Sequence, residues 1–118
     1  MCEDSMSAEF ELGGKKFHCP TEALIYVISG KWRAIILYHL FQSNVLRYSD
    51  LKKKIGTISA KMLIQELKVL ESCGVVERKM YPVVPPKVEY SLTKRGLAIC
   101  PVFKSMEAWG EKLKKKEI

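Results

Sequence analysis

The sequence predicts an α+β fold that is mainly α-helical, a winged helix-turn-helix with a terminal dimerisation helix. One observation is a capped amphipathic helix over 59–74, and a second is the alternating, proline-interrupted segment over 75–92 that follows it directly. The third is charge: residues 1–30 carry two bases against five acids, or −3, whereas residues 31–118 carry eighteen bases against eight acids, or +10. Together these features favour a nucleic-acid-binding domain.

The first part of the chain predicts an arm and two helices. Residues 1–17 lack clear periodicity, so we expect a mobile arm, with a short strand as the alternative. A helix follows over 19–30, because Pro20 suits the first helical position and Gly30 ends it. The next helix spans 31–41, and we interpret His39 on its apolar side as a core residue rather than a ligand. The stripe expected to be buried consists of Trp32, Ile35, Ile36, His39 and Leu40.

A helix-turn-helix is predicted over 49–74, after a short strand over 46–48. Ser49 is expected to cap a helix over 50–55, which Gly56 ends, and Ser59 caps a second helix, which Gly74 closes. The apolar stripe of the second helix consists of Ala60, Leu63, Ile64, Leu67 and Leu70. On the opposite side, within roughly 60° of one another, lie Lys61, Gln65, Lys68 and Ser72, and this polar face suits a DNA groove.

The segment over 75–92 predicts a hairpin, or wing. Residues 75–81 are rich in β-formers, and residues 88–92 alternate between apolar and polar side chains. The prolines between them, Pro82, Pro85 and Pro86, disfavour regular pairing and predict a stiff, protruding loop. The basic residues that flank this loop, Arg78, Lys79 and Lys87, are expected to contact phosphates.

The last helix predicts an interface. Thr93 is expected to cap a helix that runs to about Lys115, and Pro101 should kink or split it. The apolar stripe of this helix is expected to be buried against a second copy of the chain. The alternative is that the helix folds back and buries the stripe against its own core. A twofold dimer would also present two recognition helices to successive major grooves. The expected dimer interface comprises Leu24, Ile28, Ile99, Phe103, Met106, Trp109 and Leu113.

Composition bounds the class of protein. A chain of 118 residues predicts one domain over 18–118 behind the arm, and no apolar run is long enough to predict a membrane span. The acidic N-terminus without a signal-peptide core predicts a cytoplasmic protein.

Four widely spaced cysteines without a Cys-x-x-Cys motif predict neither structural zinc nor static disulfides, and no cofactor is expected. No paired carboxylates, nucleophile–base motif or phosphate-binding glycine loop indicates an enzyme.

An ordered set of short motifs extends over roughly residues 17–113. The motifs are Cys19-Pro20, Gly30-Lys31-Trp32, Arg47 through Leu51, Ile58-Ser59 with Lys61-Met62-Leu63, Leu67 through Leu70, Gly74 through Arg78, Tyr81-Pro82, Val84-Pro85-Pro86, Val88 through Thr93, and Trp109. This ordered set is specific, and through it the chain resembles the HxlR-type winged-helix transcriptional regulators. The resemblance implies a homodimer that binds double-stranded DNA, with Lys87 standing where many relatives carry arginine.

Some members of the family sense oxidants or electrophiles through a cysteine just before the first helix, which is Cys19 here. The dipole of the following helix would stabilise a thiolate at this position. Cys100, on the candidate dimer helix, is the candidate partner for an intersubunit disulfide. The alternative is that Cys19 is a buried cap and the other cysteines are small hydrophobic residues.

The sequence therefore predicts a sequence-specific DNA-binding regulator, with an unknown small-molecule or oxidant inducer. The alternative is a winged-helix module whose basic face docks an acidic protein partner. The residues expected to contact DNA are Ser59, Lys61, Met62, Gln65, Lys68, Arg78, Lys79 and Lys87.

Overall fold

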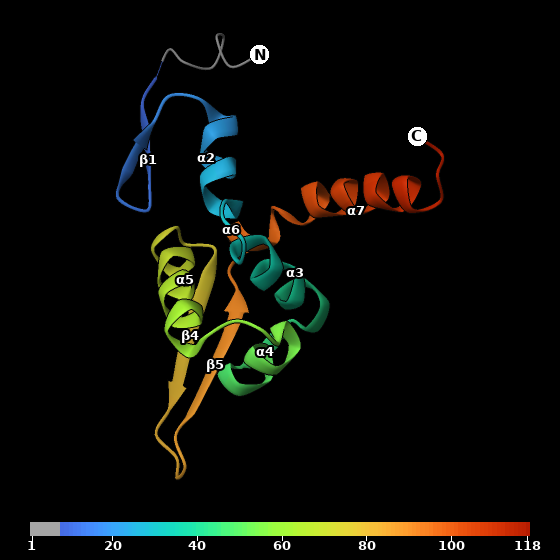
Figure 1. Ribbon diagram of the computed structural model, residues 1–118. Helices are drawn as coiled ribbons and strands as arrows, with labels where there is room; N and C mark the ends of the chain where they lie inside the picture. The colour runs from blue at the N-terminus through green and yellow to red at the C-terminus, as the bar shows by residue number, and fades with distance from the viewer. Residues whose placement is uncertain (1–7) are drawn as a thin grey trace.

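The computed structural model describes residues 8–118 as a winged-helix domain with a two-stranded hairpin before it and a long helix after it (Figure 1). The predicted fold class, a mainly helical winged helix-turn-helix with a terminal helix, is confirmed. The elements in chain order are β1 (Phe10–Leu12), β2 (Lys15–Phe17), α2 (Pro20–Ile28), α3 (Arg33–Ser43), β3 (Val45–Arg47), α4 (Tyr48–Ile55), α5 (Ala60–Ser72), β4 (Val76–Tyr81), β5 (Lys87–Leu92), α6 (Lys94–Leu97) and α7 (Cys100–Lys114).

The wing belongs to a small antiparallel sheet in the order β3-β5-β4. Strand β5 lies in the centre, where Tyr90 is paired with Leu46 of β3 on one side and with Arg78 of β4 on the other. The loop between β4 and β5 protrudes at the end of the domain far from β1 (Figure 1). It contains a cis Val84–Pro85 peptide bond. This pairing brings the start of α4, which directly follows β3, beside the wing.

The hydrophobic core lies between α3, α4, α5 and the sheet. Leu63, Leu67 and Leu70 of α5 are fully buried, as the helical spacing predicts. Ala60 and Ile64, which we assigned to the same stripe, are instead exposed, so the buried stripe of α5 is narrower than predicted. The most deeply buried members of the core are Ile36, Leu37, Leu40, Leu51, Ile58, Leu63, Leu67, Leu70, Cys73 and Val75.

Helix α3 is rotated relative to the stripe predicted for it. Leu37 is fully buried, whereas Ile35 is exposed, and Trp32 and His39 are half-buried. His39 faces no metal cluster, since no group of candidate ligands is present among residues 8–118. Partial burial and nearby Lys54 lower the pKa of His39 below its ordinary value, which keeps the imidazole neutral near pH 7.

Of the three serine and threonine caps that were predicted, two are correct and one is not. The Ser59 hydroxyl accepts a hydrogen bond from the Met62 amide at 3.1 Å, and Gly74 adopts a φ of 74° after the helix. Thr93 likewise accepts from the Gly96 amide at 3.1 Å. The predicted cap Ser49 instead lies inside α4, which begins at Tyr48 with Arg47 in the cap position and no side-chain cap.

The terminal helix is split, as Pro101 predicts. The four-residue α6 ends at Leu97, and α7 begins at Cys100 with Pro101 in its first turn. Helix α7 extends away from the rest of the protomer (Figure 1), and none of its residues is buried. Beyond its first turn, where Phe103 packs against the core, this helix does not fold back on its own protomer as the alternative predicted.

The chain before α2 is more regular than the arm we expected. Strands β1 and β2 pair antiparallel around a turn at Gly13 and Gly14, both with positive φ, so the short-strand alternative is correct over 10–17. The remainder of the predicted arm, residues 1–7, lies outside the described residues. Within 8–118 no single helix is long and apolar enough to cross a membrane, although α2 and α3 together, bent by 84°, meet the same length and composition criteria.

Candidate nucleic-acid interface

One face of α5 is polar and exposed to solvent. Lys61, Gln65 and Lys68 are all exposed, on the side of the helix opposite the buried leucines. Ser59 and Met62, at the start of the same helix, are also exposed. The predicted recognition residues on α5 therefore share one solvent-facing surface, and no other described part of the protomer covers it.

Helix α5 is held against the rest of the domain by a half-buried arginine. The Arg33 Nε atom lies 3.4 Å from Glu66 Oε2 on α5, and its Nη1 donates to the Tyr26 carbonyl at 2.8 Å. The guanidinium also lies 5.1 Å from the centre of the Tyr26 ring. This cluster ties α2, α3 and α5 together, so the orientation of the recognition surface is fixed by the domain core.

The basic residues of the wing do not all share one surface. Arg78 pairs with Tyr90, whereas Lys79 pairs with Glu89 in the next register position, so Arg78 and Lys79 point to opposite faces of the sheet. Arg78 lies on the face of the sheet that turns toward α5, where it lines a groove described below. Lys79 lies instead over the ring of Tyr81 at 5.5 Å. The structure therefore groups Arg78 with α5 and separates Lys79 from it.

Lys87, at the loop end of the wing, is partly neutralised. Its Nζ lies 3.1 Å from Glu89 Oε2 and 4.8 Å from the centre of the Tyr81 ring. The hydrogen bond from Lys87 holds the pKa of the Glu89 carboxyl below its ordinary value, so Glu89 is ionised near pH 7. Glu89 therefore neutralises part of the positive charge that Lys87 could present to a DNA phosphate.

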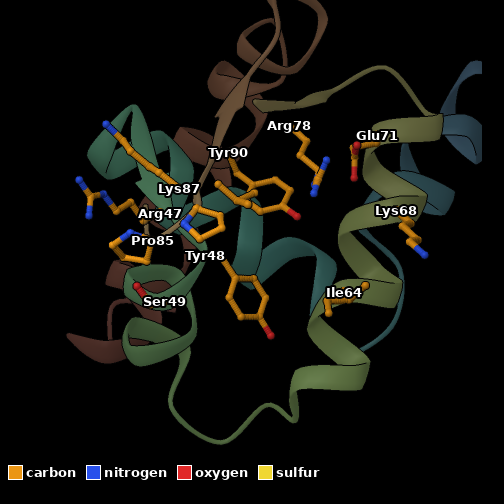
Figure 2. Close-up of a pocket in the computed structure, with 12 residues that line it drawn as sticks. Arg47, Tyr48, Ser49, Ile64, Lys68, Glu71, Arg78, Pro85, Lys87 and Tyr90 are labelled. Carbon is orange, nitrogen blue, oxygen red and sulfur yellow. The ribbon is translucent and has the colours of Figure 1, made fainter. Parts of the chain in front are cut away.

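Between α5, the start of α4 and the wing lies a groove of about 730 Å³, which we call the wing groove (Figure 2). The prediction placed three of its residues, Lys68, Arg78 and Lys87, at the interface. It missed the contribution of the β3–α4 junction, where Arg47, Tyr48 and Ser49 lie. The complete lining is Arg47, Tyr48, Ser49, Ile64, Lys68, Glu71, Arg78, Pro85, Pro86, Lys87, Val88 and Tyr90.

Two tyrosines stand in the middle of this groove (Figure 2). Burial raises the pKa of the Tyr90 hydroxyl above its ordinary value, against the opposing effect of a hydrogen bond with Arg78, so the group is a neutral phenol. The Tyr48 hydroxyl oxygen is buried and makes no hydrogen bond within the described protein. An unsatisfied buried hydroxyl costs stability, because its hydration is lost without replacement.

We expect Tyr48→Phe to raise the free energy of unfolding by about 1 kcal/mol, because it deletes that unsatisfied hydroxyl and keeps the ring. Urea denaturation followed by circular dichroism measures the change. The matched control is Tyr38→Phe at an exposed tyrosine, which should leave stability unchanged. A loss of stability in Tyr48→Phe would mean that the hydroxyl has a protein partner.

The predicted interface on the other side of the domain is only partly exposed. Leu24, Ile28, Ile99 and Phe103 are half-buried against the protomer core, and the Phe103 ring lies 5.0 Å from that of Phe41. Met106, Trp109 and Leu113 are exposed along α7, Trp109 to 60%. The two candidate redox cysteines differ as well: Cys19 is 2% exposed at the cap of α2, and Cys100 is half-buried with a free thiol.

Known proteins share this arrangement. The profile of the HxlR-like helix-turn-helix family matches residues 27–118. The uncharacterized HTH-type transcriptional regulator YkvN of Bacillus subtilis (strain 168) is 48% identical over 96 residues, which are 81% of this chain and 80% of that protein. The crystal structure of the HTH-type transcriptional regulator ytcD is similar with a TM-score of 0.76 and 41% identity, over 81% of this chain and 97% of that one. The redox regulator HypR in its oxidized form gives a TM-score of 0.73 and 40% identity, over 80% of this chain and 96% of that one.

The family match spans every element that builds the interface. It includes α3, the helix-turn-helix of α4 and α5, both wing strands and α7. The relatives are named as transcriptional regulators, a class that is not enzymatic. The chain therefore belongs to the HxlR-like helix-turn-helix family and is a transcriptional regulator of the helix-turn-helix type.

Proposed function

We propose that this regulator binds specific DNA sequences as a homodimer, with α5 in the major groove and the wing on the flanking backbone. The observation that carries the proposal is that α5 has two different sides: Leu63 and Leu67 are fully buried, whereas Lys61 and Gln65 are exposed. Lysine and glutamine can each bind base edges in the major groove. Residues 18–118 would form this DNA-binding unit with its dimerisation helix, behind the arm over 1–17, and would act in the cytoplasm, where the DNA lies.

Within this proposal the predicted contacts divide into two roles. Lys61, Gln65 and Lys68 approach base edges, supported by the neighbouring Ser59 and Met62 at the start of α5. Arg78 binds phosphates beside the groove, whereas Lys87, on the same face of the sheet as Lys79, binds them from the edge of the wing. Lys79, on the other face of the wing, meets the backbone only if the duplex curves around the wing tip, so it is the weakest of the predicted contacts.

The test is fluorescence anisotropy with duplexes from the DNA upstream of the gene and its neighbours. We expect one duplex to bind at least about a thousandfold more tightly than a scrambled duplex of the same composition. Affinity should fall steeply with added salt, because bound phosphates release counterions. Binding that ignores sequence would contradict the proposal. A protein partner that is retained after nuclease treatment, with no duplex bound, would instead favour docking of an acidic protein.

The support for a homodimer is α7. A helix of 15 residues spans about 22 Å, and its apolar side chains are left exposed in the protomer. Exposed apolar area of this kind marks interaction surfaces. Pairing of α7 with its counterpart, flanked by Leu24 and Ile28 of α2, would cover it and set two α5 helices on one face of the DNA.

We also propose that the oxidation state of the Cys19 sulfur alters DNA affinity. A similar protein, HypR, is named as a redox regulator in its oxidized and reduced forms. Of the other described cysteines, Cys73 is fully buried and burial raises the pKa of its thiol, so it is a poor nucleophile, whereas Cys100 is accessible. Because Cys19 is 2% exposed, reagents would reach it only when the surrounding chain opens.

For this sensing proposal we expect diamide and dithiothreitol to produce operator affinities that differ by about tenfold. Dithiothreitol opens a disulfide by giving one hydrogen atom to each of its two sulfurs, and diamide takes up both hydrogen atoms when the bond forms. The difference should vanish in Cys19→Ser, whereas Cys73→Ser serves as the control. A diamide-dependent covalent dimer that disappears in Cys100→Ser would identify Cys100 as the partner. Equal affinities in the unaltered protein would contradict sensing.

A further inference from the structure

The side chain of Arg33 bridges the corner between α2 and α3. Helix α2 ends at Ile28, Arg33 begins α3, and the chain bends by 84° between the two helices. The Nη1 atom of Arg33 donates to the Tyr26 carbonyl at 2.8 Å and to the Ser29 hydroxyl at 3.2 Å. Carbonyl groups in the last turn of a helix lack the amide that would follow them in a longer helix, and Arg33 supplies a charged donor there.

The same guanidinium reaches α5. Its Nε atom lies 3.4 Å from Glu66 Oε2, and only 15% and 13% of the Arg33 and Glu66 side chains are exposed. Of the ion pairs within residues 8–118, this one is the most deeply buried. Glu66 also lies against the corner itself, since a Cβ atom added at Gly30 would be 3.8 Å from Glu66 Oε1. Arg33 and Glu66 therefore link the end of α2 to the middle of α5.

This link has a direction that apolar packing lacks. The backbones of α2 and α5 approach each other at few points. The hydrophobic effect draws both helices to the core but is not directional, so it does not by itself fix their relative rotation. A planar guanidinium that bonds to acceptors on two other elements does fix it. Ion pairs of this kind add little net stability, and their best-documented role is to select one arrangement among several.

The two linked helices face different partners in the proposed function. Helix α5 presents Lys61 and Gln65 to DNA, whereas α2 presents Leu24 and Ile28 to the second protomer, beside Ile25, which is 56% exposed. In a twofold dimer, the angle between the interface helix and the recognition helix is repeated by symmetry. That angle therefore determines the distance and rotation between the two α5 helices, and with them the spacing of the half-sites that both can reach.

We propose that Arg33 is a positioning residue that, through Glu66, fixes the angle between α2 and α5 and so sets the half-site spacing of the operator. Arg33 is half-buried and belongs to α3, so it acts through α5 rather than by contact with a base. The spacing, though not the angle, rests on the DNA-binding role and the homodimer proposed above.

The first test needs no DNA. Residual dipolar couplings of the ¹⁵N-labelled full chain measure the angle between α2 and α5 in solution. We expect a single angle in the native protein, and reduced couplings along α5 in Glu66→Ala, because the helix then samples several orientations. Arg33→Lys should behave alike, since one ammonium cannot reproduce the forked contacts of a guanidinium. Glu71→Ala, at a half-buried acid further along α5, is the matched control and should keep the native angle.

The second test is fluorescence anisotropy on duplexes whose half-sites are moved apart or together in steps of one base pair. Each step rotates one half-site against the other by about 35°. The native protein should bind at least about tenfold more weakly one step from its best spacing, because the second α5 no longer engages. In Glu66→Ala and Arg33→Lys this ratio should fall to about twofold or less, while affinity for a single half-site is unchanged. The double variant should show no further effect, because the two side chains act as one link.

These results separate positioning from a merely structural role. A structural role would reduce the folded fraction and weaken binding to every duplex alike, half-sites included, and that outcome would overturn the proposal. An unchanged angle in Glu66→Ala would overturn it as well, whether or not any duplex binds, and so would a spacing ratio that this variant retains. If the native protein binds no duplex, the DNA-binding role fails, while the measured angle still decides whether Arg33 positions α5.

Discussion

Replacing Lys61 and Gln65 together by alanine should abolish preference for the operator while leaving the fold and the dimer intact. Both side chains are exposed and make no contact that the core needs, and alanine is a strong helix former, so α5 is retained. Each well-formed contact to a base edge is worth about 1–3 kcal/mol, so we expect operator affinity to fall by at least about thirtyfold. Fluorescence anisotropy against operator and scrambled duplexes measures the change.

A control matched in side-chain type is available for this pair. Lys53 and Gln42 are also exposed, on α4 and α3, and neither belongs to α5 or lines the wing groove. Replacing both by alanine should leave the ratio between operator affinity and scrambled-duplex affinity unchanged. It should lower only the salt-dependent affinity that both duplexes have in common. If instead the two double variants lose preference equally, α5 does not read the bases.

Trp109→Glu should convert the protein to a monomer and weaken operator binding by at least a factor of about 10². Because Trp109 is 60% exposed in the protomer, an acid there is hydrated and does not disturb folding. In an α7 pair the same acid would be buried without a partner, at a cost of several kcal/mol. A monomer then binds one half-site at a time and loses the gain from two linked recognition helices.

Sedimentation equilibrium measures this change in mass, and thermal unfolding checks the protomer. Val45→Glu, at an exposed valine of β3, is a control that adds the same charge to a different apolar surface and should remain dimeric. A native protein that sediments as a monomer, or a Trp109→Glu variant that remains a dimer with full affinity, would show that α7 is not the interface.

Local signals predicted much of the fold. Ser59, Gly74 and Thr93 mark helix ends through hydrogen bonds and backbone conformations that involve only near neighbours in the sequence, so the helix and wing boundaries were close to those observed. The fully buried Leu63 and Leu67 were predicted for a similar reason, since helical periodicity places them together. Pro101 predicted the break between α6 and α7.

The wing groove could not be predicted in the same way. Arg47 and Tyr48 reach it because β3 pairs with β5, and this pairing joins segments about forty residues apart that no local pattern links. Ile64 fits a helical apolar stripe by spacing, and only the placement of the wing beside α5 shows that it lines a groove instead. Arg47 belongs to one of the motifs through which the chain resembles its family. That motif was the only sequence signal that the β3–α4 junction could contribute to the site.

Chemical-shift mapping of the ¹⁵N-labelled protein during titration with its operator duplex tests the recognition role of α5 most directly. The account predicts that the largest amide shifts fall on Lys61, Gln65 and Lys68, with a second group at Arg78 and Lys87 on the wing. Amides along α7 should change little, because that helix would already be paired in the free dimer. Shifts concentrated on α7 or α2, with α5 unchanged, would contradict the account.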